Sequence, residues 1–213
     1  MKYKCIVFDC DGVLVDTEHI SISTLLELGR KYGAEIDLDF AMVDFVGKSL
    51  EYCYGYIKER CTKSFPVDFV QQYRSLSFER FKKNLQAIDG VKELIQKLEI
   101  PFCVASNGPL DKMQLNLQTV GLDVFFGDNM FSAYQINKFK PDPALFIHAA
   151  ASLGFKPEEC VVIEDSDVGV RAAINGGFDV FGFANKRSEA LLKETGAKLF
   201  YSMHELYDLL EKQ

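Results

Sequence analysis

Four short runs of apolar, mainly β-branched and aromatic residues recur along the chain, and they limit the folds that it can adopt. They are Ile6–Phe8, Phe102–Ala105, Val161–Ile163 and Val180–Phe183. Runs of this length and composition are typical of strands that are buried on both faces, as in a parallel sheet. Between them, segments such as residues 91–98 place their apolar residues at helical spacing. The alternation predicts an α/β fold with a doubly wound, Rossmann-like parallel sheet.

One long segment interrupts this alternation. Residues 17–86 contain no comparable strand run, and their pattern favours helices. The helices are expected near residues 17–32, 50–60 and 67–83. We therefore predict a catalytic core of residues 1–16 and 87–213, with a small α-helical cap domain, residues 17–86, inserted after the first strand. The C-terminal stretch from Asn185 is expected to contribute only surface helix and loop packing.

The balance of charges and the cysteines narrow the class of protein. Among 213 residues, 24 Lys and Arg oppose 31 Asp and Glu, which gives a net charge of −7. Such a chain repels nucleic-acid phosphates and anionic lipids, so neither nucleic acid nor a membrane is an expected partner. No apolar run approaches the roughly 20 residues that cross a bilayer, and the N-terminal apolar run is too short for a signal peptide. Six cysteines without a CxxC pair favour reduced, buried thiols over disulfides or a zinc site. A cytoplasmic protein is therefore expected. A monomer is also favoured over an oligomer.

Acidic residues follow two of the predicted strands, at the sheet edge where doubly wound folds bind ligands. Asp9 and Asp11 are two residues apart, so both carboxylates can point to the same face. Glu164 and Asp165 follow the third run. A lone Asp-x-Asp is usually a solvated loop. However, convergent carboxylates repel one another unless a cation lies among them, and hard oxygen ligands favour Mg²⁺ over zinc.

Groups that donate hydrogen bonds to an anion follow the second run. Ser106 and Asn107 end that run, and Pro109 stands near the start of a predicted helix, whose free N–H groups attract anions. Lys140 lies in a proline-constrained Lys-Pro-Asp-Pro segment. Taken singly, these features are a turn and a surface lysine. Their ordered recurrence at strand ends favours a phosphate site beside the metal.

These residues carry a resemblance to a known family. The segment Asp9–Asp16, then Ser106-Asn107, then Lys140, then Glu164–Ser166 resemble the four ordered motifs of the haloacid dehalogenase (HAD) superfamily. The motif order and the helical insertion together span nearly the whole chain. The resemblance therefore implies a HAD-type core with a helical cap.

The resemblance also implies a role for each motif residue. Asp9 would be the nucleophile that forms an aspartyl-phosphate, and it would need no activating base because an ordinary aspartate is ionised at pH 7. Asp11 would act as general acid and then as general base. The remaining roles are phosphoryl binding by Ser106, Asn107 and Lys140, and Mg²⁺ binding by Asp9, the backbone carbonyl of Asp11, Glu164 and Asp165.

Within the family, the second aspartate favours phosphate-ester chemistry, because dehalogenation leaves no alcohol to protonate. The closest alternative is phosphoryl transfer of the β-phosphoglucomutase type. Asp16 and Thr17 resemble that type, but Ser21 occupies the position of its cap histidine, and His19 lies out of register. Two non-enzyme alternatives remain. A phosphoryl-accepting signalling domain would need no helical cap, and a non-catalytic HAD regulator that only binds phosphate would not need every catalytic position to be filled, as it is here.

Two segments bear on the substrate. Residues 45–49 resemble the family's substrate-specificity loop. Two roles are equally expected for Lys48 in this loop: a solvated surface side chain, or a partner for a second negative charge on the substrate. Residues 104–149 resemble bacterial phosphatases acting on 6-phosphogluconate and similar sugar phosphates. The expected partner is thus a small phosphorylated metabolite, a sugar phosphate or sugar acid.

Overall fold

The chain forms two compact units. The computed structural model describes residues 2–46, 48–185 and 188–212. One unit comprises the segments up to Asp16 and from Gln86 onward, and the other comprises Thr17–Leu85. The second unit ends one residue before the boundary that the sequence predicts.

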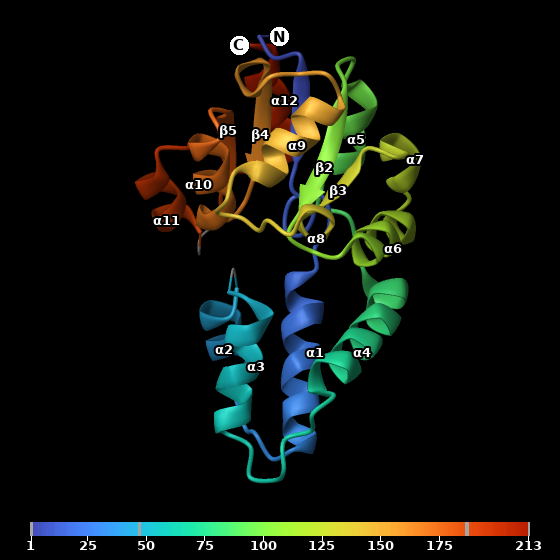
Figure 1. Ribbon diagram of the computed structural model, residues 1–213, viewed down its shortest axis with the longest axis vertical. Helices are drawn as coiled ribbons and strands as arrows, with labels where there is room; N and C mark the ends of the chain where they lie inside the picture. Colours follow the sequence, from blue (N-terminus) through green and yellow to red (C-terminus); the bar gives the residue numbers. More distant parts are fainter. Residues whose placement is uncertain (1, 47, 186–187, 213) are drawn as a thin grey trace. The chain divides into compact units, whose positions relative to one another are not determined.

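A six-stranded parallel sheet forms the centre of the first unit (Figure 1). Its strands are β1 (Cys5–Phe8), β2 (Phe102–Ser106), β3 (Met130–Ser132), β4 (Cys160–Glu164), β5 (Asp179–Phe183) and β6 (Lys198–Phe200). The strand order is β3-β2-β1-β4-β5-β6. β2 and β3 therefore lie on one side of β1, and β4, β5 and β6 lie on the other. β1 and β4 are buried along their whole length, which explains why their sequences are continuously apolar. The predicted Rossmann-like α/β fold is confirmed.

Helices connect these strands and cover the sheet. They are α5 (Val91–Lys97), α6 (Leu110–Val120), α7 (Asp123–Phe126), α8 (Ala133–Ile136), α9 (Ala144–Ser152), α10 (Asp167–Asn175), α11 (Glu189–Thr195) and α12 (Met203–Glu211). A short 3₁₀ turn, Pro157–Glu159, precedes β4. α9 packs on β1 and β2, and α10 packs on β4 and β5.

The expectation for the C-terminal stretch is wrong. Residues after Asn185 supply β6, which pairs with β5, and α12, which contacts α5 and β6. Phe200, Leu206 and Leu210 are fully buried. The strand signal was too short to recognise, because only three residues form β6 and its first, Lys198, is exposed.

The second unit is a group of four helices with its own core. They are α1 (Glu18–Lys31), α2 (Leu38–Asp44), α3 (Leu50–Glu59) and α4 (Phe69–Asn84). α1 contacts each of the other three. The sequence pattern indicated all but α2, whose N-terminus is capped by Asp37, the side chain of which accepts a hydrogen bond from the backbone N–H of Phe40.

Two further features concern the state of the cysteines and the character of the helices. All six cysteines carry free thiols; five are buried and Cys61 is half-buried. Across the described residues, none of the helices has both the length and the apolar character that a bilayer crossing requires.

Candidate active site

The candidate site lies at the carboxyl ends of the three strands in the middle of the sheet. Asp9 directly follows β1, Ser106 is the last residue of β2, and Glu164 is the last residue of β4. β1 pairs with both β2 and β4, so the sheet itself brings the three segments together. This is the edge at which open parallel sheets bind their ligands.

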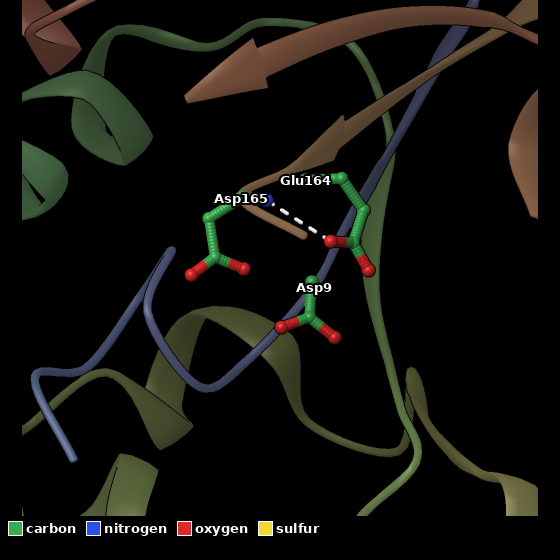
Figure 2. Close-up of side chains that lie close together, drawn as sticks. All are labelled: Asp9, Glu164 and Asp165. Atoms are coloured by element: carbon green, nitrogen blue, oxygen red, sulfur yellow. Dashed lines mark hydrogen bonds between the residues drawn. The ribbon is translucent and has the colours of Figure 1, made fainter. Parts of the chain in front are cut away.

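Three carboxylates converge there. One oxygen from each of Asp9, Glu164 and Asp165 lies within 4.8 Å of the other two (Figure 2). Asp9 and Glu164 are buried and Asp165 is half-buried. Gly12 makes the arrangement possible: its φ is +87°, and a Cβ atom at this position would lie 2.0 Å from Asp165 Oδ2. The glycine of the first motif therefore leaves room for the aspartate of the fourth.

Lys140 is the cation of this site. Its ammonium donates hydrogen bonds to Asp9 Oδ1 at 2.5 Å and to Glu164 Oε1 at 2.7 Å, and the side chain is almost fully buried. The Asn107 amide holds the Lys140 backbone: Oδ1 accepts from its N–H at 2.9 Å, and Nδ2 donates to its carbonyl at 3.4 Å. Asn107 therefore acts on the site indirectly, by holding the backbone of Lys140.

Glu164 is held by both of its oxygens. While Oε1 accepts from Lys140, Oε2 accepts from the backbone N–H groups of Asp165 and Ser166 and from the Ser166 hydroxyl, at 2.9–3.0 Å. Figure 2 shows the first of these backbone bonds as a dashed line. The side chain sits over Gly169 of α10, where a Cβ atom would lie 1.8 Å from Oε1. The orientation of Glu164 is therefore fixed by the turn that follows it.

Burial and neighbouring charges change the acidity of the central pair. Burial raises the pKa of Asp9 to about 7, opposed by the Lys140 charge and reinforced by Glu164 and Asp11. For Lys140, burial lowers the pKa, but Asp9 and Glu164 outweigh that effect and the net pKa is raised. In the absence of a metal ion, burial therefore favours the protonated form of Asp9 more than in an ordinary aspartate. A cation among the carboxylates would restore the ionised form.

Asp11 is not part of the three-carboxylate group in the described chain. Its side chain contacts α6 instead: Lys112 Nζ donates to Asp11 Oδ2 at 2.8 Å, and Asn116 Nδ2 donates to Oδ1 at 3.4 Å. Neither Lys112 nor Asn116 was among the residues predicted from the sequence. Two signals could have found them, namely their spacing of four residues on one helix and the position of Asn116 beside the buried Leu117.

Ser106 and Lys48 complete the predicted set, and the structure places them differently. Ser106 is buried, and its hydroxyl accepts from the Gly108 N–H at 3.0 Å, which orders the loop between β2 and α6. Lys48 belongs to the second unit, where it is exposed and its Nζ lies 5.9 Å from the centre of the Tyr52 ring. Gly47, in the same predicted specificity loop, lies outside the described residues.

The three carboxylates suit a hard divalent cation. Their oxygens lie close enough to share one ion, and like charges at this spacing repel strongly in its absence. Lys140 offsets part of this repulsion through Asp9 and Glu164, whereas Asp165 directs its carboxylate into the space above Gly12. The donor set contains oxygen only, which favours Mg²⁺ over zinc.

Comparisons with known proteins identify the family and several relatives of this chain. A family model described as haloacid dehalogenase-like hydrolase matches residues 3–177. The 6-phosphogluconate phosphatase of Escherichia coli K12 is 32% identical over 183 residues, which cover 85% of this chain and 83% of that protein.

Two solved structures are similar over nearly the whole chain. A HAD-family hydrolase from Deinococcus radiodurans, with bound phosphate and sodium, is 28% identical with a TM-score of 0.84, covering 99% of this chain and 96% of that one. A Thermotoga maritima protein proposed to be a β-phosphoglucomutase is 25% identical with a TM-score of 0.84, covering 98% and 99%.

Proposed function

This chain belongs to the haloacid dehalogenase-like hydrolases and is a phosphatase of that family, and we propose that it hydrolyses a phosphorylated sugar or sugar acid such as 6-phosphogluconate. The observation that carries the proposal is the buried contact of Lys140 with Asp9 and Glu164, beside Asp165. In the proposed reaction, Asp9 supplies the nucleophile, Lys140 the phosphate-binding cation, and Asp165 a metal ligand.

The proposed reaction proceeds in two steps on Asp9. Its carboxylate attacks phosphorus, the P–O bond to the sugar breaks, and Asp11 gives its proton to the departing alkoxide oxygen. Asp11 then takes a proton from the water that attacks the aspartyl-phosphate, which releases inorganic phosphate and restores both carboxyl groups. Lys140 and the loop of Ser106 and Asn107 stabilise the charge on the transferring group.

Mg²⁺ is the proposed cofactor. Asp9, the backbone carbonyl of Asp11, Glu164 and Asp165 would hold it, with Glu164 binding directly or through water. When bound, the ion supplies positive charge that reduces the repulsion between the carboxylate nucleophile and the phosphate. Asp9 gains its nucleophilic form in the same environment, because a nearby cation favours the ionised carboxylate.

The proposal is tested by phosphate release from a panel of monoesters, with and without Mg²⁺. The panel holds 6-phosphogluconate, hexose and pentose phosphates, phosphoglycolate and nucleotides. We expect Mg²⁺-dependent release that falls at least about 10³-fold in Asp9→Asn while the fold survives, because the covalent step is lost. Asp128→Asn, an exposed aspartate before β3, is the matched control and should retain full activity. Turnover by Asp9→Asn close to that of the wild type would rule out the covalent mechanism.

The preference for a sugar acid rests on Lys48. Because residues 45–49 resemble the family's substrate-specificity loop and the Lys48 side chain is exposed there, we propose that its ammonium pairs with the second negative charge of the substrate. Lys48→Ala should raise KM for 6-phosphogluconate about tenfold and leave KM for neutral hexose phosphates unchanged. Lys58→Ala, on the neighbouring α3, is the matched control. Equal KM values in Lys48→Ala and the wild type would remove this role.

The mutase alternative has support from the Thermotoga maritima structure, and the same panel distinguishes it. A mutase would convert β-glucose 1-phosphate into glucose 6-phosphate without accumulating free phosphate, whereas the proposed phosphatase releases phosphate from both. A stable phosphoprotein with no release would instead favour the regulator. The six free thiols support a reducing compartment such as the cytoplasm as its location.

A further inference from the structure

Helix α6 contains two residues that are poor choices for a helix in these positions. Lys112 stands in its first turn, where the helix dipole disfavours a cation. Asn116 is fully buried, and within the described chain its carbonyl oxygen Oδ1 has no hydrogen-bond donor. An apolar residue would suit this position better, since it lies beside Leu117 and three residues after Met113, both buried.

Both residues contact the same carboxyl group. Lys112 and Asn116 are four residues apart, so they share one face of α6. Lys112 Nζ lies 2.8 Å from Asp11 Oδ2, and Asn116 Nδ2 lies 3.4 Å from Asp11 Oδ1. Each oxygen of Asp11 therefore has its own partner on this helix.

We propose that Lys112 and Asn116 are positioning residues that orient Asp11 for proton transfer. Asp11 is only two residues from Asp9, and its carboxylate would be drawn to a cation held by Asp9, Glu164 and Asp165. The contacts with α6 fix the carboxyl outside that group, where it can reach the oxygen of the leaving group instead. The inference rests on the proposed function, in which Asp11 is the acid and base.

The leaving group separates this role from a purely structural one. p-Nitrophenolate is stable as an anion and departs without a proton, whereas the alkoxide of a sugar needs one. A defect in the orientation of Asp11 must therefore slow the release of a sugar and spare the release of p-nitrophenolate. A general distortion of the site would slow both.

The experiment measures release of the leaving group in a single turnover, with enzyme in excess, by rapid quench. Its substrates are p-nitrophenyl phosphate and the best sugar phosphate of the panel. In Lys112→Met and in Asn116→Leu we expect sugar release to fall about 10- to 100-fold, part of the contribution of a general acid, and p-nitrophenolate release to change less than about twofold. Gln118→Leu, an exposed position on α6, should change neither rate.

A double variant and a melting curve complete the test. If Asn116 acts through Asp11, Asp11→Asn combined with Asn116→Leu should release sugar no more slowly than Asp11→Asn alone. Asn116→Leu should melt no earlier than the wild type, because it removes a buried carbonyl that lacks a donor. Should that variant fail to fold, Lys112→Met carries the test alone, since its side chain is partly exposed.

The outcomes for the two proposals are distinct. The positioning role would be overturned by any of three results: equal losses for both esters, no loss for either ester, or multiplicative losses in the double variant. In each case, turnover by the wild type would still support the phosphatase. A wild-type enzyme that releases neither leaving group would refute the proposed function, and the positioning role would fall with it.

Discussion

Gly12 is the residue that gives Asp165 its place. The left-handed backbone at Gly12 and the approach of Asp165 Oδ2 both exclude a side chain. Gly12→Ala should therefore lose about 1–2 kcal/mol of unfolding free energy to the backbone alone, and the clash adds to that loss. It should also weaken Mg²⁺ binding, because Asp165 must move away.

Gly121 provides the matched control for this prediction. It also has a positive φ, +69°, but no atom lies within 4 Å of the position that a Cβ would take. Gly121→Ala should lose a similar backbone energy in urea unfolding and keep its Mg²⁺ affinity in calorimetric titration. If Gly12→Ala binds Mg²⁺ as tightly as Gly121→Ala does, the glycine has no part in placing Asp165.

Individual site residues could be predicted from the sequence only where the backbone pattern places them. Asp9, Glu164 and Lys140 were expected to converge because a strand end or a proline-constrained segment positions each, and the structure brings them together. For Lys112 and Asn116, the helical spacing and the place of Asn116 beside the buried Leu117 mark the two residues but do not identify their partner. Their contacts depend on the direction in which α6 crosses the end of β1, and a helical pattern does not reveal that direction.

At the scale of elements, replacing Gly169 of α10 with alanine should lower the unfolding free energy, whereas the same substitution at an ordinary helical glycine raises it. Alanine is favoured over glycine in a helix by about 0.5–1 kcal/mol. However, a Cβ at Gly169 would lie 1.8 Å from Glu164 Oε1. Gly169→Ala should therefore destabilise the protein by about 1–3 kcal/mol, as overpacking does, and should lower phosphate release because Glu164 is displaced from Lys140.

Gly55 of α3 is the comparison for this prediction. No atom lies within 4 Å of its Cβ position, so Gly55→Ala should raise the unfolding free energy by about 0.5–1 kcal/mol. Chemical denaturation of both variants provides the measurement. A Gly169→Ala protein that is more stable than the wild type, as Gly55→Ala should be, would contradict the close packing of α10 on Glu164.

The strands differ in how well they can be predicted from their sequences. β1, β2, β4 and β5 were predicted because strands in the middle of a parallel sheet are covered on both faces and must be apolar throughout. β3 and β6 lie at the two edges of the sheet and contain three residues each. Each also includes a polar residue, Ser132 or Lys198, so neither forms a continuous apolar run and only pairing with β2 and β5 identifies them.

At the scale of the whole molecule, the division into two units could be predicted from the sequence, but the relation between the units could not. A stretch of about 70 residues without a strand signal predicted a helical insertion after β1, and Thr17–Leu85 forms a separate unit with its own apolar core. The sequence pattern reports what each unit buries within itself. It contains no comparable signal for the place of Lys48 relative to Asp9, because exposed residues on different units have no shared period.

The repulsion among the three carboxylates makes the stability of the whole protein depend on a cation. An ion that binds only the folded state, at 100 times its dissociation constant, adds about 2.7 kcal/mol to the unfolding free energy. For a chain of this length that corresponds to a rise in Tm of about 5–10 °C. Scanning calorimetry of the wild type with EDTA and with Mg²⁺ should show this rise.

Two aspartate variants connect the rise to the site. Asp165→Asn removes one of the three converging charges, so Mg²⁺ should hardly change its Tm, and with EDTA it should melt no earlier than the wild type because the repulsion is smaller. Asp128→Asn removes an exposed charge elsewhere and should retain the full rise. An equal rise in Asp165→Asn and the wild type would mean that the ion acts outside this carboxylate group. A Tm that Mg²⁺ hardly changes in Asp165→Asn, beside a full rise in Asp128→Asn, would show that this site gives up stability without metal in order to bind the metal.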